Sequence, residues 1–288
     1  MNLKGKKKLI VIKPNGNHSN RLQQNLHFEV FCKEHDIEYH NPTLNNIADL
    51  YTQPCNTETN LFLKFLQIDL LGKLFRHSRV VKKIFSVVWI ISKLSPLKLV
   101  RFDKESEISN SEELLLNAFK KNDVVYVAGW RFRLTELSKK YWAEMSKKYT
   151  IKASIYEKNL LVNRVNDLLS NGYVLVGIHI RRGDYIKWKN GIYCFNDSVY
   201  KKYMDSVSEQ LSNNDNEKHV FILFSNENID FQQTNKVIIS KETWYIDHHI
   251  MSLCHYLIGP PSTFTLWASY IGQGKLIHIY DSNDNIKI

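Results

Sequence analysis

The sequence predicts an α/β protein built on mostly parallel sheets, and three observations support this prediction. Short apolar segments typical of strands alternate with longer segments that have helical periodicity. Turn-forming clusters separate several of them, as at 14–17 and 171–172. The chain has 288 residues, enough for two domains of ordinary size. Alternation of this kind is typical of doubly wound sheets.

The first half is predicted to begin with a strand, a turn and a helix. The strand is K-L-I-V-I-K at 8–13, the turn is Pro-Asn-Gly-Asn, and Ser19 or Asn20 can cap a helix over 21–34. Further strands are expected at 37–39 and 124–128, and further helices at 135–149 and 156–169. The Asn-Gly pair at 171–172 marks the predicted boundary between domains 1–170 and 171–288.

The second half switches repeatedly between the two periodicities. Strands are predicted at 173–180, 220–224, 256–259 and 276–280. Helices are predicted at 197–211, 247–255 and 262–271. This order is that of a parallel sheet with helical crossovers.

Basic residues are concentrated in one window. The chain carries 39 Lys and Arg against 29 Asp and Glu, a net charge of +10, and 61–104 alone holds ten basic and two acidic residues. The window is also rich in aliphatic residues, so we expect a basic helical insertion. Its lysines either face solvent on a packed bundle or contact anionic lipid head groups. Because aliphatics dominate and no RRM, KH or C2H2 pattern is present, no nucleic-acid partner is expected.

The cysteines and apolar segments predict a cytoplasmic protein. The four cysteines, Cys32, Cys55, Cys194 and Cys254, form no C-x-x-C pair and are expected to be reduced thiols. The apolar run 9–12 is too short for a signal peptide, and no stretch approaches the ~20 residues of a spanning helix. Peripheral contact with the inner face of the cytoplasmic membrane remains compatible with the basic window.

The end of the strand at 173–180 carries the first candidate site, His179, Arg181, Arg182 and Asp184. Ligands bind at the carboxyl ends of strands in open α/β sheets, and paired guanidinium groups match diphosphate oxygens. The alternative is a surface arginine pair beside a satisfied histidine.

A second candidate follows the strand at 256–259. Gly-Pro-Pro leads into Ser262, Thr263 and Phe264 at the start of a helix, where backbone N–H groups and the helix dipole favour an anion. Simple N-capping by either hydroxyl is the alternative. Next to the arginine pair, a phosphate site is the better interpretation.

Two further motifs are less specific. Asn17 and Arg21 lie in another strand-to-helix turn that could approach a sugar or phosphate, although neither G-x-G-x-x-G nor a P-loop is present. Asp247 precedes adjacent histidines, which on a helix do not face one metal. Its carboxylate could instead accept hydrogen bonds from guanine. No D-x-D sequence occurs, so no metal is expected.

These motifs together resemble bacterial α-1,2-fucosyltransferases of glycosyltransferase family 11. H-I-R-R-G-D-Y at 179–185 is similar to the family's H-x-R-R-G-D-Y, and 247–267 resembles its D-x-x-x-M-S and S-x-F-S-x-W motif. The N-terminal G-N-H-S-N-R-L is a more distant match. The resemblance implies a GT-B-like fold of two Rossmann-like lobes, a GDP-fucose donor and metal-independent transfer with inversion to an α-1,2 linkage.

The resemblance also implies roles for individual residues. Arg181 would bind the donor diphosphate, His179 would lie by the nucleoside, and Asp247 would read guanine. Ser262 and Thr263 would contact the β-phosphate, with Phe264 beside them. Arg182 matches the motif. Asp184 is the candidate base, or else a structural partner of an arginine.

The acceptor implied by the resemblance is a galactose-containing bacterial surface glycan, such as an O-antigen repeat unit, which can be linked to a lipid diphosphate. It is expected in the N-terminal lobe near Asn17, Arg21 and 130–133, with GDP-sugar binding in 171–288. Two alternatives stay open. One is transfer of another GDP-linked deoxysugar, such as colitose. The other is a non-catalytic protein that binds nucleotides or nucleic acid.

Overall fold

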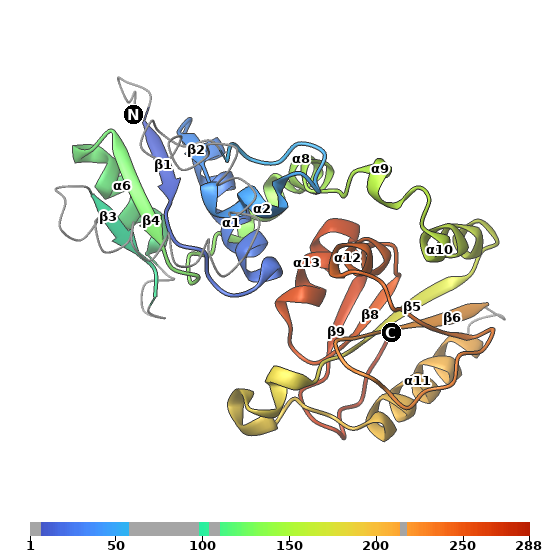
Figure 1. Cartoon of the computed structure of the whole chain (residues 1–288). Helices are drawn as coiled ribbons and strands as arrows, with labels where there is room; N and C mark the ends of the chain where they lie inside the picture. Colours follow the sequence, from blue (N-terminus) through green and yellow to red (C-terminus); the bar gives the residue numbers. More distant parts are fainter. Residues whose placement is uncertain (1–6, 58–97, 104–109, 214–217) are drawn as a thin grey trace. The chain divides into compact units, whose positions relative to one another are not determined.

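The computed structural model describes residues 7–57, 98–103, 110–213 and 218–288 (Figure 1). Contacts within the chain divide it into two compact units, Met1–Tyr149 and Thr150–Ile288. Within these ranges each unit contains one sheet, and every strand pairing in both sheets is parallel. The predicted α/β class with parallel sheets is therefore confirmed.

The first unit has a four-stranded sheet in the order β2-β1-β4-β3. Its elements are β1 (Lys8–Val11), α1 (His18–Glu34), β2 (Glu38–His40), η1 (Pro42–Leu44), α2 (Asn45–Ala48), β3 (Leu99–Arg101), α6 (Ser111–Lys121), β4 (Val124–Ala128), α7 (Thr135–Lys140) and α8 (Trp142–Lys148). Apolar side chains of α1 and α6, including Phe28, Phe31 and Phe119, pack with Leu9 and Val127 of the sheet.

Helix α1 buries polar as well as apolar side chains. Asn25 is fully buried, and its amide donates to the Tyr149 hydroxyl at 2.6 Å and to Glu29 at 3.1 Å. The amide of Asn41 in turn donates to the Asn25 carbonyl oxygen at 2.9 Å. These bonds offset the cost of burial and hold α1 in place through polar contacts.

The second unit has a five-stranded sheet in the order β7-β6-β5-β8-β9. Its elements are α9 (Ala153–Tyr156), α10 (Leu160–Ser170), β5 (Val174–Ile180), η4 (Gly183–Ile186), η5 (Trp188–Gly191), α11 (Asp197–Ser212), β6 (His219–Ser225), β7 (Val237–Ile239), α12 (Trp244–Ser252), β8 (Tyr256–Gly259), α13 (Thr263–Gly272) and β9 (Lys275–His278).

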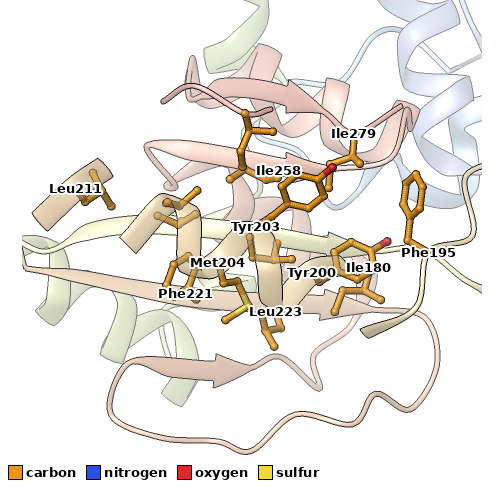
Figure 2. Close-up of a cluster of buried hydrophobic side chains, with 14 residues drawn as sticks. Ile180, Phe195, Tyr200, Tyr203, Met204, Leu211, Phe221, Leu223, Ile258 and Ile279 are labelled. Carbon is orange, nitrogen blue, oxygen red and sulfur yellow. The ribbon is translucent and has the colours of Figure 1, made fainter. Parts of the chain in front are cut away.

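Helices cover both faces of this sheet. On one face, Tyr200, Tyr203 and Met204 of α11 pack against apolar side chains of β5, β6 and β8 such as Ile180 and Leu223 (Figure 2). On the other, α10, α12 and α13 bury the alternate side chains of the same strands. Because successive strand residues point to opposite faces, His179 faces the side covered by α12 and α13.

Several boundaries differ from the predicted ones. The units divide after Tyr149 and not at 170–171, because Val162 and Val165 of α10 pack into the core of the second unit. The predicted helix 135–149 is two helices separated at Tyr141, whose backbone departs from helical angles. The predicted helix 156–169 corresponds to α10, which begins only at Leu160 because Asn159 caps it, while Tyr156 ends the separate short helix α9.

Most of the predicted basic insertion at 61–104 lies outside the described residues. Within the part that is described, 98–103 contains the strand β3 and not a helix. Among the described residues, no helix combines the length and apolar character needed to cross a membrane.

The strand order places a switch point between β5 and β8. The chain leaves β5 for β6 and β7 on one side, then returns to β8 and β9 on the other. Crossover connections diverge at such a point, and ligands of open α/β sheets bind outside the strand ends there.

Candidate functional site

Three neighbouring strands present a row of residues at this switch point. Ile178 pairs with Ile258, and Gly259 pairs with His278, so His179, Gly259 and His278 lie side by side on one face. A Cβ atom at Gly259 would lie 2.6 Å from the carbonyl oxygen of His179. Glycine therefore allows the close approach of β8 to β5 between the two imidazoles.

The imidazole of His179 is buried and stacked. It is 4% exposed, and its ring lies 5.4 Å from that of Phe264 with 25° between the planes. Burial, with Arg181 and His278 nearby, lowers the pKa of His179 to about 3, so the ring is neutral. Its Nδ1 is buried without a hydrogen-bond partner among the described residues, as is Nε2 of His278. Two imidazole nitrogens at the strand ends thus lack the partner that buried polar atoms usually have.

Arg181 follows β5 directly. Its guanidinium forms an ion pair with Asp184 at 2.8 Å and lies 5.3 Å from the ring of Tyr185. Its Nε is buried and has no partner in the part of the chain that the structure describes. The Tyr185 hydroxyl donates to the carbonyl oxygen of Pro261 at 2.6 Å, which ties this loop to the turn before α13. Arg181 is therefore positioned by two neighbours, and not all of its donors are used by them.

Arg182 has a different environment from Arg181. Its guanidinium pairs with Asp197, the first residue of α11, and its backbone N–H donates to Asn226 at 3.0 Å. Asp197 also accepts from the backbone N–H of Asp230 at 3.0 Å. Arg182 thus links the loop after β5 to α11 and to the loop after β6, so the predicted arginine pair separates into two roles.

Helix α13 begins at the same strand ends. The Ser262 hydroxyl accepts from the backbone N–H of Phe264 at 3.1 Å, so Ser262 is the N-cap. Thr263 is the first helical residue, and Thr265 donates to the Ser262 carbonyl at 3.1 Å. The positive end of the helix dipole lies beside these hydroxyls, where a phosphate would be stabilised.

Asp247 lies on α12, which packs against α13. The Ser240 hydroxyl donates to its Oδ1 at 2.5 Å. Burial raises the pKa of Asp247 to about 7, the Ser240 bond opposes this shift, and Glu242 adds to it. The adjacent histidines point to different partners, since His248 lies 3.9 Å from Phe264 and His249 stacks on Tyr156 at 3.9 Å.

Asn17 and Arg21 belong to the first unit. Asn17 is the N-cap residue of α1, with extended backbone and no side-chain capping bond. Arg21 is 5% exposed and donates to the Thr43 carbonyl and, at 2.6 Å, to Asn46. Burial lowers the pKa of Arg21 to about 10. The second cation predicted from the sequence is thus engaged inside its own unit.

Three residues near the site have no role that the sequence predicts. They are His278, Tyr185 and Ser240, which is the hydrogen-bond partner of Asp247. Tyr185 could have been found, because it ends the motif at 179–185. His278 could not, because only the order of strands β5, β8 and β9 places it beside His179.

Known proteins resemble the chain at two levels. Residues 73–286 match the family model of glycosyl transferase family 11. Human galactoside alpha-(1,2)-fucosyltransferase 1 is 29% identical over 119 residues, which cover 36% of this chain and 30% of the human protein. The gorilla protein matches to the same extent. The chain thus spans well under half the length of the curated relatives it matches.

Solved structures agree on the fold. A mutant of Arabidopsis thaliana FUT1 in complex with GDP has a TM-score of 0.56 and 12% identity, over 96% of this chain and 71% of the plant protein. NodZ alpha-1,6-fucosyltransferase soaked with GDP-fucose has a TM-score of 0.50 and 12% identity, over 92% and 93%. The fold is GT-B-like, with two Rossmann-like units. With three quarters of its length matched by the family model, the chain belongs to glycosyl transferase family 11.

Proposed function

We propose that this protein transfers L-fucose from GDP-fucose to a galactoside hydroxyl and forms an α-1,2 linkage. The observation that carries the proposal is the meeting of Arg181, the neutral His179 and the N-terminus of α13 at the switch point of the second unit. The fucosyltransferase names of the human relative and of the NodZ structure support the choice of sugar.

The guanosine part of the donor would contact α12 and β5. In its ionised form, Asp247 would accept hydrogen bonds from the N1–H and amino group of guanine. The Nδ1 of His179, for which the described residues supply no partner, would make a polar contact to the nucleoside, and Phe264 holds that ring in place. Its neutral state suits a site that binds a neutral base and sugar.

The diphosphate would lie between Arg181 and α13. Arg181 is a fixed cation whose Nε has no partner within the described residues, and the helix end supplies dipole and hydroxyl donors at Ser262 and Thr263. Arg182, held by Asp197, would keep the loop in shape and contact the donor only indirectly.

The proposed reaction is direct displacement with inversion. The acceptor oxygen forms a bond to the anomeric carbon of fucose while the bond to the β-phosphate oxygen breaks. The electron pair of that bond goes to GDP, and the acceptor hydroxyl proton goes to a base or to water. Arg181 and the α13 dipole would stabilise the charge that develops on the leaving phosphate, the task that a metal performs in other transferases.

The assignment of Asp184 as this base remains a proposal. Its ion pair with Arg181 supports a second role, in which it orients the guanidinium toward the diphosphate. The positioning role therefore has the stronger geometric support.

For the acceptor, we propose a bacterial surface glycan such as a lipid-diphosphate-linked O-antigen repeat unit. A cytoplasmic enzyme with the basic window 61–104 at the inner membrane face would meet such a substrate. Loss of binding to anionic vesicles on charge reversal within 61–104 would support this location, and unchanged binding would exclude it.

The central experiment measures nucleotide preference and product together. In the presence of EDTA, GDP should raise the melting temperature of the full chain, while UDP and ADP should not. GDP-fucose and lactose should then give a fucosylated product whose linkage is read by NMR. Stabilisation by UDP but not GDP, or transfer to a hydroxyl other than position 2 of galactose, would contradict the proposal.

A further inference from the structure

Four aromatic rings continue outward from the candidate site. The ring of Tyr185 lies 4.7 Å from that of Trp188, Trp188 lies 5.4 Å from Tyr193, and Tyr193 lies 6.3 Å from Tyr280. We call these four residues the aromatic row. Three of them come from residues 183–193, a loop that contains η4 and η5 and is yellow in Figure 1. The fourth, Tyr280, comes from the segment after β9.

The row is continuous with the donor site at both ends. Tyr185 contacts Arg181 at one end, with 5.3 Å between the guanidinium carbon and the ring centre. At the other end, the ring of Tyr280 lies 5.9 Å from His278, which neighbours His179 across β8. A molecule on the row would therefore lie against the same strand ends as the donor diphosphate.

Two members of the row are open to solvent, one inside it and one at its end. Trp188 is 41% exposed, although tryptophan is highly buried on average, and Tyr280 is 59% exposed. Exposed apolar patches next to a site commonly mark ligand-binding grooves. The row therefore leaves aromatic faces available to a partner that the described residues do not supply.

The loop that carries Trp188 is held in an unusual conformation. Lys189 and Asn190 both have left-handed backbone angles, with φ of 47° and 59°. Each such non-glycine residue costs on the order of 1 kcal/mol. The turn places the ammonium of Lys189 5.2 Å from the Trp188 ring and 5.6 Å from Tyr193. A hydrogen-bond donor thus lies directly beside the aromatic faces.

We propose that the aromatic row and Lys189 form a subsite for the acceptor saccharide. A pyranose ring has one face lined by C–H groups, which are attracted to the negative face of an aromatic ring. Its hydroxyls can accept from Lys189 and exchange hydrogen bonds with the tyrosine hydroxyls. This inference rests on the proposed function, and it assigns to the second unit part of the acceptor binding that the sequence placed in the first.

A bilayer surface is the competing partner for exposed aromatic residues. Ile186 and Ile192 on the same loop are 59% and 55% exposed and would insert together with Trp188. The saccharide is favoured because the row leads to Arg181 and His278 at the site of the proposed transfer, which membrane insertion would not require.

The kinetic test uses the full chain, GDP-fucose and lactose. Trp188→Ala should raise the KM for lactose about fivefold, because the loss of one stacked ring is worth on the order of 1 kcal/mol. GDP affinity and the acceptor-free hydrolysis of GDP-fucose should not change. Trp188→Phe should retain most of the lactose affinity. Lys189→Ala should weaken lactose, while the matched control Lys187→Ala, an exposed lysine on the same loop, should not.

A binding measurement separates this inference from the proposed function. In the presence of GDP, lactose should change the tryptophan fluorescence of the wild type but not that of Trp188→Phe, whether or not transfer occurs. An unchanged lactose KM in Trp188→Ala, or no fluorescence response in the wild type, would overturn the subsite. Loss of binding to phosphatidylglycerol vesicles in both Ile186→Ala and Trp188→Ala, with lactose binding intact, would identify a membrane contact and overturn it too.

If the wild type neither binds GDP nor hydrolyses GDP-fucose, the proposed function fails. That result is distinct from failure of the subsite, in which the donor reactions persist and only the predicted effect on lactose is missing.

Discussion

Phe264 stacks on His179 across the switch point, with ring centres 5.4 Å apart. The contact joins the second residue of α13 to the end of β5, two elements far apart in the sequence. Phe264 also contacts His248 of α12, with 3.9 Å between the two ring centres. One aromatic side chain therefore sets the spacing of the three elements that we propose hold the donor.

Phe264→Leu tests this arrangement. Leucine keeps the apolar character but removes the flat ring, so His179 loses its support. Aromatic pairs contribute about 0.5–1.5 kcal/mol beyond burial, so we expect GDP affinity to fall about threefold to tenfold, measured by calorimetry. Phe264→Tyr, which keeps the ring, is the matched control. Equal GDP affinities of the leucine variant and the wild type would contradict the proposed role.

The two arginines of the motif should separate function from stability. Arg181→Ala should lower kcat by about 10²–10³, because a stabiliser of the leaving phosphate is lost, while the melting temperature changes little. Arg181→Lys should recover part of the rate, since the charge remains without the planar geometry. Kinetics with GDP-fucose and lactose measure both effects.

Arg182→Ala should instead reduce stability. It leaves Asp197 without its ionic partner at the start of α11, and only 16% of that side chain is exposed. Breaking such a pair should lower the free energy of unfolding by about 1–3 kcal/mol. Asp197→Ala should have a similar effect, and the double variant should cost less than the sum of the two. Additive losses would show that the ion pair does not stabilise the protein.

Features set by local sequence could be predicted. Strands β4 and β8 have the predicted bounds, because turn residues delimit both apolar runs. Ser262 is the N-cap of α13, one of the two hydroxyl residues for which capping was the alternative interpretation. The buried strand that ends just before Arg181 was also located, and β5 begins one residue later than predicted.

Features that depend on strand order could not be predicted. Strands β3 and β7 have three residues each, too few for a periodic pattern, and both lie at sheet edges. The pairing of Arg182 with Asp197 and the neighbourhood of His179 and His278 arise only when the sheet is assembled. The sequence therefore locates the strand-end motifs. It does not show the ion pair that separates the environment of Arg182 from that of Arg181.

Asp184 should act through Arg181. If it orients the guanidinium, Asp184→Asn should weaken GDP binding and lower kcat by about tenfold, while the pH dependence of kcat keeps its shape. Asp184→Glu should restore part of the activity by renewing the ion pair. Loss of the acidic limb of the pH profile in Asp184→Asn would instead identify Asp184 as the base that accepts the acceptor proton.

The buried Asp247 should lower the stability of the protein at neutral pH. It should also make nucleotide binding depend on pH. Burial raises its pKa in the folded protein to about 7, from a usual value of 3.8. As pH rises from about 4 to about 7, the unfolded chain releases this proton while the folded chain retains it, so the folded state loses stability. The loss is complete above about pH 7 and amounts to a few kcal/mol.

Asp247→Asn should therefore raise the melting temperature relative to the wild type, by an amount that grows from pH 4 to pH 7 and is then constant. Asparagine can still accept from the Ser240 hydroxyl, so the local structure should persist. Guanine recognition should fail, because an amide group would face the guanine donors with its own N–H. We expect GDP affinity at pH 8 to fall about tenfold to a hundredfold.

In the wild type, GDP affinity should weaken about tenfold for each pH unit below 7, since the carboxyl group must first release its proton. Calorimetric titration with GDP at pH 6, 7 and 8 tests this, and wild-type affinity that is equal at all three values would show that Asp247 does not bind guanine as a carboxylate.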